Sequence, residues 1–292
     1  DRKEQIKQAR LIWSQGFIAE EIEYFCKNNE FMDTTEKRHK GLLTGDDLAN
    51  WSATIEKPLC YDYKNFTVCK TGPWGQGPTF LQQLALLKEF DLDSLDENSP
   101  EFIHLIVEAT KLAFADREAF YGDTNFNDVP MDILLGEEYN AKRRNLISKE
   151  ASMEVRPGVI PGFGGKVLVR PKGGTPESFS KFDIGEPTVA RFDEPNPSSL
   201  GDTKGDTTHF DIIDKWGNMI AGTPSGGWLQ SSPIIPNLGF CLSNRGQMFW
   251  LDEKSPACIG PKRRPRTTLS PSLALKDGLP YMVFGTPGGD QQ

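Results

Sequence analysis

The stretch GDTTHFDIID, residues 205–214, marks the point where a long segment rich in proline and glycine gives way to alternating apolar residues. Residues 208–213 and 219–223 are rich in apolar and β-branched side chains and are separated by a polar turn, which predicts an antiparallel hairpin. The same pattern returns at residues 269–275 and 281–284. We therefore expect the last third of the chain to be built mainly from β-hairpins.

Helical periodicity dominates the chain before this point. Apolar residues repeat at helical spacing in two stretches of residues 1–30 and again over residues 99–121. Ser99 is an N-cap residue for the longest helix, and Thr44 begins a short one. Residues 61–70 alternate as a short strand. Helices first and hairpins later predict a layered α+β fold rather than alternating βαβ units.

The composition excludes several classes of protein. The chain has 292 residues with 33 Lys and Arg against 41 Asp and Glu, a net charge of −8, which argues against a nucleic-acid partner because such binding depends on basic charge. No apolar run approaches the ~20 residues of a membrane span. The five cysteines form no Cys-x-x-Cys pair, so we expect no metal site. Free thiols are predicted, with a Cys60–Cys69 bridge as the alternative.

The distribution of proline and glycine divides the chain into three parts. Residues 1–155 are mainly helical, residues 156–206 form a long Pro/Gly-rich loop with a short strand at 167–169, and residues 207–292 are β-rich. Both ends of the chain look cut. We therefore expect any compartment signal to lie outside it, and the choice between an exported and a cytoplasmic protein stays open.

The start of the first predicted hairpin contains the strongest candidate for a catalytic residue. A hydroxyl is a poor nucleophile without a base, and the chain has no Gly-x-Ser-x-Gly motif and three histidines. His39 and His104 fall in polar or amphipathic helical stretches, which favours structural roles. A threonine that becomes an N-terminus by self-cleavage uses its own amine as the base. A long loop leading to Thr207 fits that requirement, although an ordinary strand start explains the same residues.

The motifs of the chain resemble one family. The string TTHFDIID at residues 207–214, followed by Gly217-Asn218, closely resembles the start of the small subunit of γ-glutamyltranspeptidases, which are N-terminal-nucleophile hydrolases. The resemblance continues in the strings KRRPRTTLSP at 262–271 and GTPGG at 285–289. Three upstream strings resemble the end of the family's large subunit: GFIAE at 16–20, LTGDDL at 43–48 and AFADR at 113–117.

This resemblance covers nearly the whole chain in the family's order and implies a fold and a maturation step. The fold is a four-layer αββα sandwich, which we expect to be incomplete here because strands from both missing ends belong to it. Self-cleavage between Asp206 and Thr207 would yield two segments that stay associated. Thr207 would then be the nucleophile, with its new amine as the base. No metal or organic cofactor is implied.

The resemblance also assigns supporting residues around this nucleophile. Gly288 and Gly289 match the family's oxyanion-hole pair, whose backbone N–H groups approach a developing negative charge. Three further positions carry hydroxyls. Thr267 and Thr268 match a pair that contacts the substrate carboxylate, and Thr223 lies where the family places hydroxyls beside the nucleophile.

The sequence departs from the family at the positions that recognise the substrate. Ser225 replaces a usual threonine beside the nucleophile and keeps its hydroxyl, but Gly227 replaces an asparagine. Arg245 and Met248 fall near a glutamine and an aspartate that hold the glutamyl amino group, and neither accepts a hydrogen bond from an ammonium. We assign Arg245 to substrate binding. The motifs support the type of reaction better than they support any particular substrate.

Three functions follow from these motifs. The leading one is cleavage of a γ-glutamyl amide such as glutathione by Thr207, with transfer of the acyl group to water or an amine. The second is an acylase of the same chemistry that accepts glutaryl or aryl amides, which Gly227, Arg245 and Met248 favour. The third, from another class, is an uncleaved and inactive binding relative.

Overall fold

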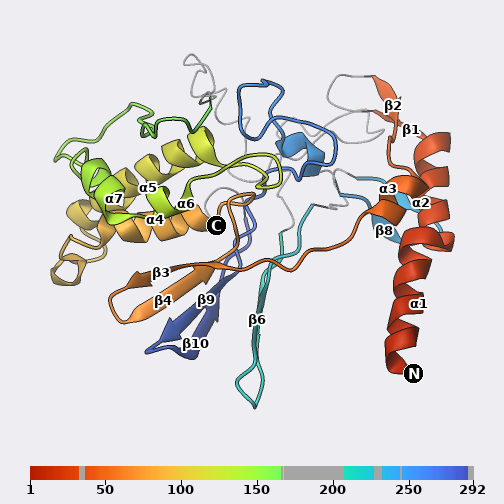
Figure 1. Cartoon of the computed structure of the whole chain (residues 1–292), viewed down its shortest axis with the longest axis horizontal. Coiled ribbons are helices and arrows are strands. Elements are labelled where there is room, and N and C mark those ends of the chain that lie inside the picture. The colour runs from red at the N-terminus through yellow and green to blue at the C-terminus, as the bar shows by residue number, and fades with distance from the viewer. Residues whose placement is uncertain (33–36, 166, 168–206, 227–231, 244, 289–292) are drawn as a thin grey trace. The chain divides into compact units, whose positions relative to one another are not determined.

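The computed structural model describes the chain except for residues 33–36, 166, 168–206, 227–231, 244 and 289–292 (Figure 1). The described residues belong to two compact units that interleave along the sequence. The smaller unit contains residues 1–56 and 225–244, and the larger one contains residues 57–175, 207–224 and 245–292. The strand predicted at 167–169 lies outside the described residues, apart from Val167.

The larger unit is built on a four-stranded antiparallel sheet with the strand order β10-β9-β4-β3. Its central contact is the pairing of β4 with β9, in which Phe66 lies opposite Lys276 and Lys70 opposite Ser272. Strands on the two sides of the predicted cleavage point thus share one sheet. The strands are β3 (Leu59–Tyr63), β4 (Phe66–Lys70), β9 (Ser272–Lys276) and β10 (Leu279–Phe284).

The single strand predicted over residues 61–70 is wrong, because this region is a hairpin. Lys64 has a positive φ of 54° and turns the chain between β3 and β4, so that Cys60 lies opposite Cys69. The two cysteines form a disulfide with a Cα–Cα distance of 4.1 Å. The prediction of free thiols is therefore wrong for this pair, since directly opposed positions of an antiparallel pair lie within disulfide reach.

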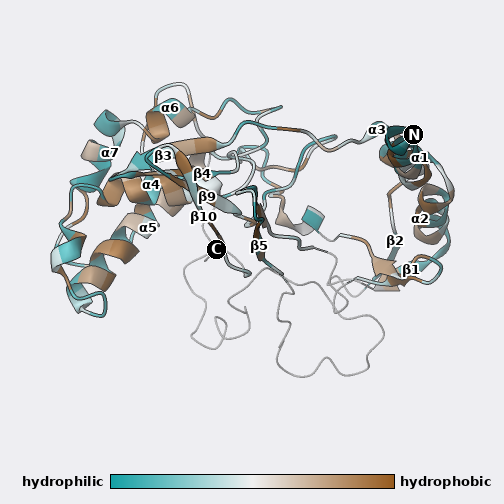
Figure 2. Cartoon of the chain, turned by 90° about the horizontal axis from the view of Figure 1, so that it is seen from below, coloured by the Kyte–Doolittle hydropathy of each residue, from teal (hydrophilic) through white to brown (hydrophobic). Residues whose placement is uncertain are grey.

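Helices cover this sheet (Figure 1). α4 packs against β3 and β4, and α5 and α7 pack against α4. Leu86, Leu87, Ala109, Leu112 and Ala113 form a buried cluster between α4 and α5, and Figure 2 shows brown, hydrophobic stretches on both helices. The helices are α4 (Gly77–Leu87), the 3-10 turn η1 (Leu92–Ser94), α5 (Pro100–Phe120), α6 (Met131–Leu134) and α7 (Glu137–Arg144). The predicted helix over 99–121 is confirmed, with the Ser99 hydroxyl accepting from the Phe102 N–H at 3.1 Å.

A buried carboxylate ties α5 to its neighbours. Asp116 is fully buried and lies 3.1 Å from Nη2 of Arg143 on α7. It also accepts hydrogen bonds from Gln82, from Tyr139 and from the Gly158 N–H. Burial raises the pKa of Asp116, while Arg143 and these donors act in the opposite direction. The network fixes α5 against α4 and α7.

The hairpin predicted from residue 208 is confirmed. β5 (Phe210–Ile213) pairs with β6 (Met219–Gly222) in an antiparallel register that sets Phe210 opposite Gly222. β10 contacts both of these strands. The second predicted hairpin is confirmed as β9 and β10.

The smaller unit confirms the helices predicted in residues 1–50. Ile22 and Cys26 of α2 form a buried cluster with Ile235. Thr44 and Asp47 form a capping box at the start of α3. The elements are α1 (Arg2–Gln15), α2 (Phe17–Asn28), β1 (Glu30–Met32), β2 (Arg38–Lys40), α3 (Gly45–Asn50), β7 (Ile234–Ile235) and β8 (Phe240–Cys241).

The described part of the chain is thus a mixture of helices and antiparallel sheets, as expected for an α+β fold, while the four-layer sandwich stays a prediction. No helix within this part has the length and apolar character needed to cross a membrane.

Lys70, at the end of β4, is a buried base. Its side chain donates to the Ser270 carbonyl at 3.0 Å and to the Ser272 hydroxyl at 2.6 Å, and its Nζ lies 4.7 Å from the Phe80 ring centroid. Burial lowers the pKa of Lys70 to about 8. Since the unfolded chain keeps a pKa near 10.5, the folded state is penalised whenever Lys70 must carry its proton.

We predict that Lys70→Met removes this penalty. At pH 7 the variant should be more stable by up to about 3 kcal/mol, from about 1.36 kcal/mol per pKa unit. Between pH 8 and 10.5 the unfolded state binds more protons, so wild-type stability rises with pH relative to the variant. Urea unfolding at pH 7 and 9.5 measures this. Lys149→Met is the exposed control, and an equal pH response of wild type and Lys70→Met would contradict the prediction.

Candidate active site

The predicted nucleophile lies beside one of the predicted oxyanion-hole glycines. Thr207 is partly buried, and its hydroxyl donates to the Gly288 carbonyl at an Oγ1–O distance of 3.4 Å. Gly288 follows β10 and has a φ of 137°, a conformation that residues with a side chain rarely adopt. The structure therefore brings together two residues that are 81 positions apart in the sequence.

The β5–β6 ladder extends to the residue after Thr207. The Thr208 N–H donates to the Pro224 carbonyl at 3.2 Å, which continues the antiparallel register by one step. In this register His209 lies opposite Thr223, and His209 Nδ1 is 2.7 Å from Thr223 Oγ1. The predicted site residue Thr223 is therefore held by a histidine.

Other predicted site residues fall outside this description. Asp206, Gly227 and Gly289 belong to the residues that the structure does not describe. Ser225 is half-buried and belongs to the smaller unit, whereas Thr207 belongs to the larger one. Their roles stay predictions.

Thr267 and Thr268 are both buried, just before β9. Thr267 forms an isolated bridge with Gly75, and its hydroxyl accepts a hydrogen bond from the Leu269 N–H at 3.2 Å. A Cβ on Gly75 would lie 3.3 Å from Cγ2 of Thr267, so the turn at residues 72–78 packs closely on this threonine.

Partly buried ion pairs hold the segment that carries these two threonines. Arg264 donates to Asp123 from its backbone N–H at 2.7 Å and from its guanidinium at 3.0 Å. Arg266 donates to Glu118 of α5 at 2.5 Å. Burial on its own would raise the pKa of Asp123, but the hydrogen bonds from Arg264 and from the Asn125 N–H hold it below its usual value. Two of the basic residues at 262–266, Arg264 and Arg266, are thus paired within the protein.

Arg245 and Met248, which we expect near the positions of the family's glutamyl-binding pair, lie in a short helical turn, η2 (Arg245–Met248). Met248 is buried and Arg245 is half-buried.

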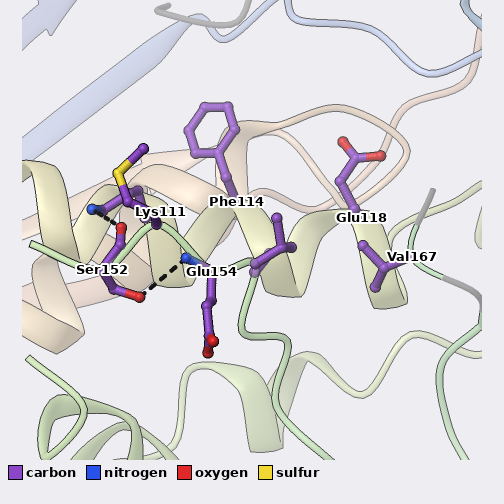
Figure 3. Close-up of a pocket in the computed structure, with 9 residues that line it drawn as sticks. Lys111, Phe114, Glu118, Ser152, Glu154 and Val167 are labelled. Carbon is purple, nitrogen blue, oxygen red and sulfur yellow. Dashed lines mark hydrogen bonds between the residues drawn. The ribbon is translucent and has the colours of Figure 1, made fainter. Parts of the chain in front are cut away.

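A pocket of about 360 Å³ lies along α5 (Figure 3). Phe114 and Glu118 project from the helix, and the facing segment is tied to it by Lys111, which donates to the Ser152 carbonyl at 2.6 Å. No residue that the sequence predicted for the site lines this pocket. Within the described residues no group of three or more His, Cys, Asp or Glu side chains is placed to hold a metal ion.

Sequence reasoning missed two residues that hold the site. His209 stands inside the motif at 207–214 but receives no role from the sequence, and Asp123 receives none either. A cross-strand register drawn from the predicted hairpin would have set His209 opposite Thr223. Nothing local indicates Asp123, because Arg264 is 141 residues away.

A comparison with known families gives one match over almost the entire chain. The γ-glutamyltranspeptidase model matches residues 5–292. This chain belongs to the γ-glutamyltranspeptidase family. The expected family is therefore confirmed.

Individual relatives agree with this assignment. The chain is similar to the glutathione hydrolase proenzyme of Bacillus subtilis subsp. natto, at 30% identity over 99% of this chain and 45% of that protein. It is also similar to the acylase ACY 1 proenzyme of Pseudomonas sp. (strain SE83), at 26% identity over 85% of this chain and 38% of that protein. The solved structure of LmbA2991 is 50% identical with a TM-score of 0.84, covering 100% of this chain and 46% of that one. The chain thus spans less than half the length of these relatives.

We predict that Asp123→Asn destabilises the protein by about 2 kcal/mol, because it removes the charge of a buried carboxylate that bonds the partly exposed Arg264. The folded pKa of Asp123 is below the unfolded one, so its contribution is present at neutral pH and is lost as the pH falls through the folded pKa. The difference in the free energy of unfolding between wild type and variant should become smaller in acid. Urea unfolding at pH 7 and pH 4 measures it, with the exposed Asp128→Asn as control. A variant as stable as wild type at pH 7 would exclude this role for Asp123.

Proposed function

We propose that Thr207 is the nucleophile of an amide-cleaving acyltransferase and that the chain matures by self-cleavage between Asp206 and Thr207. The observation that carries the proposal is the contact of the Thr207 hydroxyl with the Gly288 carbonyl. It places the hydroxyl at the turn that holds the proposed oxyanion donors. Family membership supports the same chemistry.

The freed amine of Thr207 takes the hydroxyl proton as Oγ1 attacks the substrate carbonyl. The N–H groups of Gly288 and Gly289 stabilise the tetrahedral oxyanion, a contribution of about 3 kcal/mol for one such donor. The amine of the substrate leaves with the proton, and an ester to Thr207 remains. Water or a second amine then attacks this ester and releases the acyl group.

The sheet explains how the two products of self-cleavage stay together. Segment 1–206 contributes β3 and β4, and segment 207–292 contributes β9 and β10. The β4–β9 ladder and the pair of Arg264 with Asp123 cross the cleavage point. The two segments therefore remain one folded unit after the peptide bond is cut.

The leading substrate class is a γ-glutamyl amide such as glutathione. The support is the similarity to a glutathione hydrolase proenzyme. In this proposal Thr267 and Thr268 contact the substrate carboxylate, Thr223 and Ser225 place hydroxyls beside the nucleophile, and Arg245 binds the substrate.

The second candidate is an acylase for glutaryl or aryl amides. Its support is the similarity to the acylase ACY 1 proenzyme together with the residues at η2. Arg245 is a cation and Met248 is apolar, so neither offers an acceptor to a substrate ammonium, whereas a guanidinium binds a carboxylate.

Intact-mass spectrometry of the purified protein tests the nucleophile. Wild type should separate into two masses that correspond to a cut between Asp206 and Thr207, and Thr207→Ala should remain a single chain with no amidase activity. Thr110→Ala, a change at an α5 hydroxyl that bonds the Ile106 carbonyl, is the matched control and should be cleaved normally. A folded wild-type protein that stays uncleaved would contradict the proposal and favour the third function, an inactive binding relative.

Hydrolysis of two anilides separates the two substrate classes. A γ-glutamyl anilide carries an α-amino group that a glutaryl anilide lacks. The leading proposal expects kcat/KM to be at least about 10-fold higher for the γ-glutamyl compound, since a site that bonds a polar group rejects the analogue without it. The reverse preference would establish the acylase.

A further inference from the structure

His209 lies at a junction of three segments. Its Nδ1 is 2.7 Å from Thr223 Oγ1 at the end of β6, and its Nε2 is 2.9 Å from Oδ1 of Asp211 on β5. The histidine side chain is 6% exposed and that of Asp211 is 27% exposed. At this distance Nε2 lies close to the Asp211 carboxylate but makes no aligned hydrogen bond with it.

The hairpin register accounts for two of these contacts. His209 and Thr223 are directly opposed across the antiparallel pair, where side chains on one face lie about 5 Å apart at Cβ. Asp211 is two residues further along the same strand, and side chains two positions apart point to the same face. The three side chains therefore form a row on one face of the hairpin.

The third segment is the exit from β10. A Cβ on Gly285 would lie 2.2 Å from Cε1 of His209 and 2.6 Å from Nε2. No side chain fits there while the ring keeps its place, so the imidazole rests directly on the Gly285 backbone. Gly285 is three residues before Gly288.

These contacts surround the proposed nucleophile. Thr207 is two residues before His209, and its hydroxyl touches the Gly288 carbonyl. The segment that runs from Thr207 into β5 and the turn that contains Gly288 are thus held together by the His209 ring as well as by Thr207 itself.

We propose that His209 is a positioning residue that sets the distance between Thr207 and the Gly288 turn by bonding Thr223 and packing on Gly285. The inference rests on the proposed function, because it assumes that Thr207 attacks the substrate. Asp211 and Thr223 hold the ring from its two nitrogen atoms, and Gly285 provides the space for it. His209 does not touch the substrate in this proposal.

Steady-state kinetics of His209→Ala test the role. A displacement of reacting groups by about 1 Å lowers the rate by about 100-fold, so we expect kcat to fall by that order while KM changes by less than about 3-fold. His209→Asn keeps a polar atom near the Nδ1 position and should recover about 10-fold of the loss. His104→Ala, at a half-buried α5 histidine that bonds the Ser148 carbonyl, should match wild type.

A double-mutant cycle tests the contact with Gly285. Gly285→Ala alone should lower kcat, because its methyl group displaces the ring. Combined with His209→Ala, it should cost nothing further, since no ring is left to displace. If the losses in kcat of the two single variants simply add, the contact between His209 and Gly285 is overturned. A cleaved His209→Ala protein with wild-type kcat would overturn the positioning role.

Amide hydrogen exchange separates this inference from the proposed function. In the Thr207→Ala background, which needs no activity, His209→Ala should raise exchange at the Thr208 amide by about 10-fold or more and leave the α5 amides unchanged. Unchanged exchange at Thr208 would overturn the positioning role even if Thr207 proves to be the nucleophile. Increased exchange would support it even if wild type fails to cleave itself.

Discussion

The pairing of β4 with β9 is the constraint on which the larger unit depends. It joins residues near position 70 to residues near position 272, and the side chain of Lys70 donates across it to the Ser270 carbonyl and the Ser272 hydroxyl. Such a distant pairing has an entropic cost of loop closure in the intact chain. Once it is formed, the predicted cut between Asp206 and Thr207 leaves two segments that share one sheet. The proposed maturation would therefore require no rearrangement of this core.

Buried charge supports the site without taking part in it. Asp123 and Glu118 belong to the helical half of the larger unit, and each binds an arginine of the segment that carries Thr267 and Thr268. Removing one partner of such a pair leaves an uncompensated charge in the interior. The segment is thus tied to the α5 region, and its basic residues are neutralised where they lie.

Small residues as well as polar ones surround Thr207, the proposed nucleophile. Gly288 adopts a φ that a side chain would disfavour, and Gly285 leaves room for the His209 ring. These glycines allow the backbone after β10 to approach the start of β5. Gly285 and Gly288 are therefore required for packing, in addition to the oxyanion role that we propose for Gly288.

The sequence by itself determined the elements that local forces decide and the family that its motifs define. The helix over 99–121 follows from its Ser99 cap and its apolar spacing, and the two hairpins follow from alternation around polar turns. Only the tertiary structure decided which distant partners meet. The Cys60–Cys69 bridge needed the turn at Lys64, and Asp123 met Arg264 across 141 positions. Such contacts leave no periodic trace in the sequence, because they depend on where whole elements pack rather than on the residues beside them.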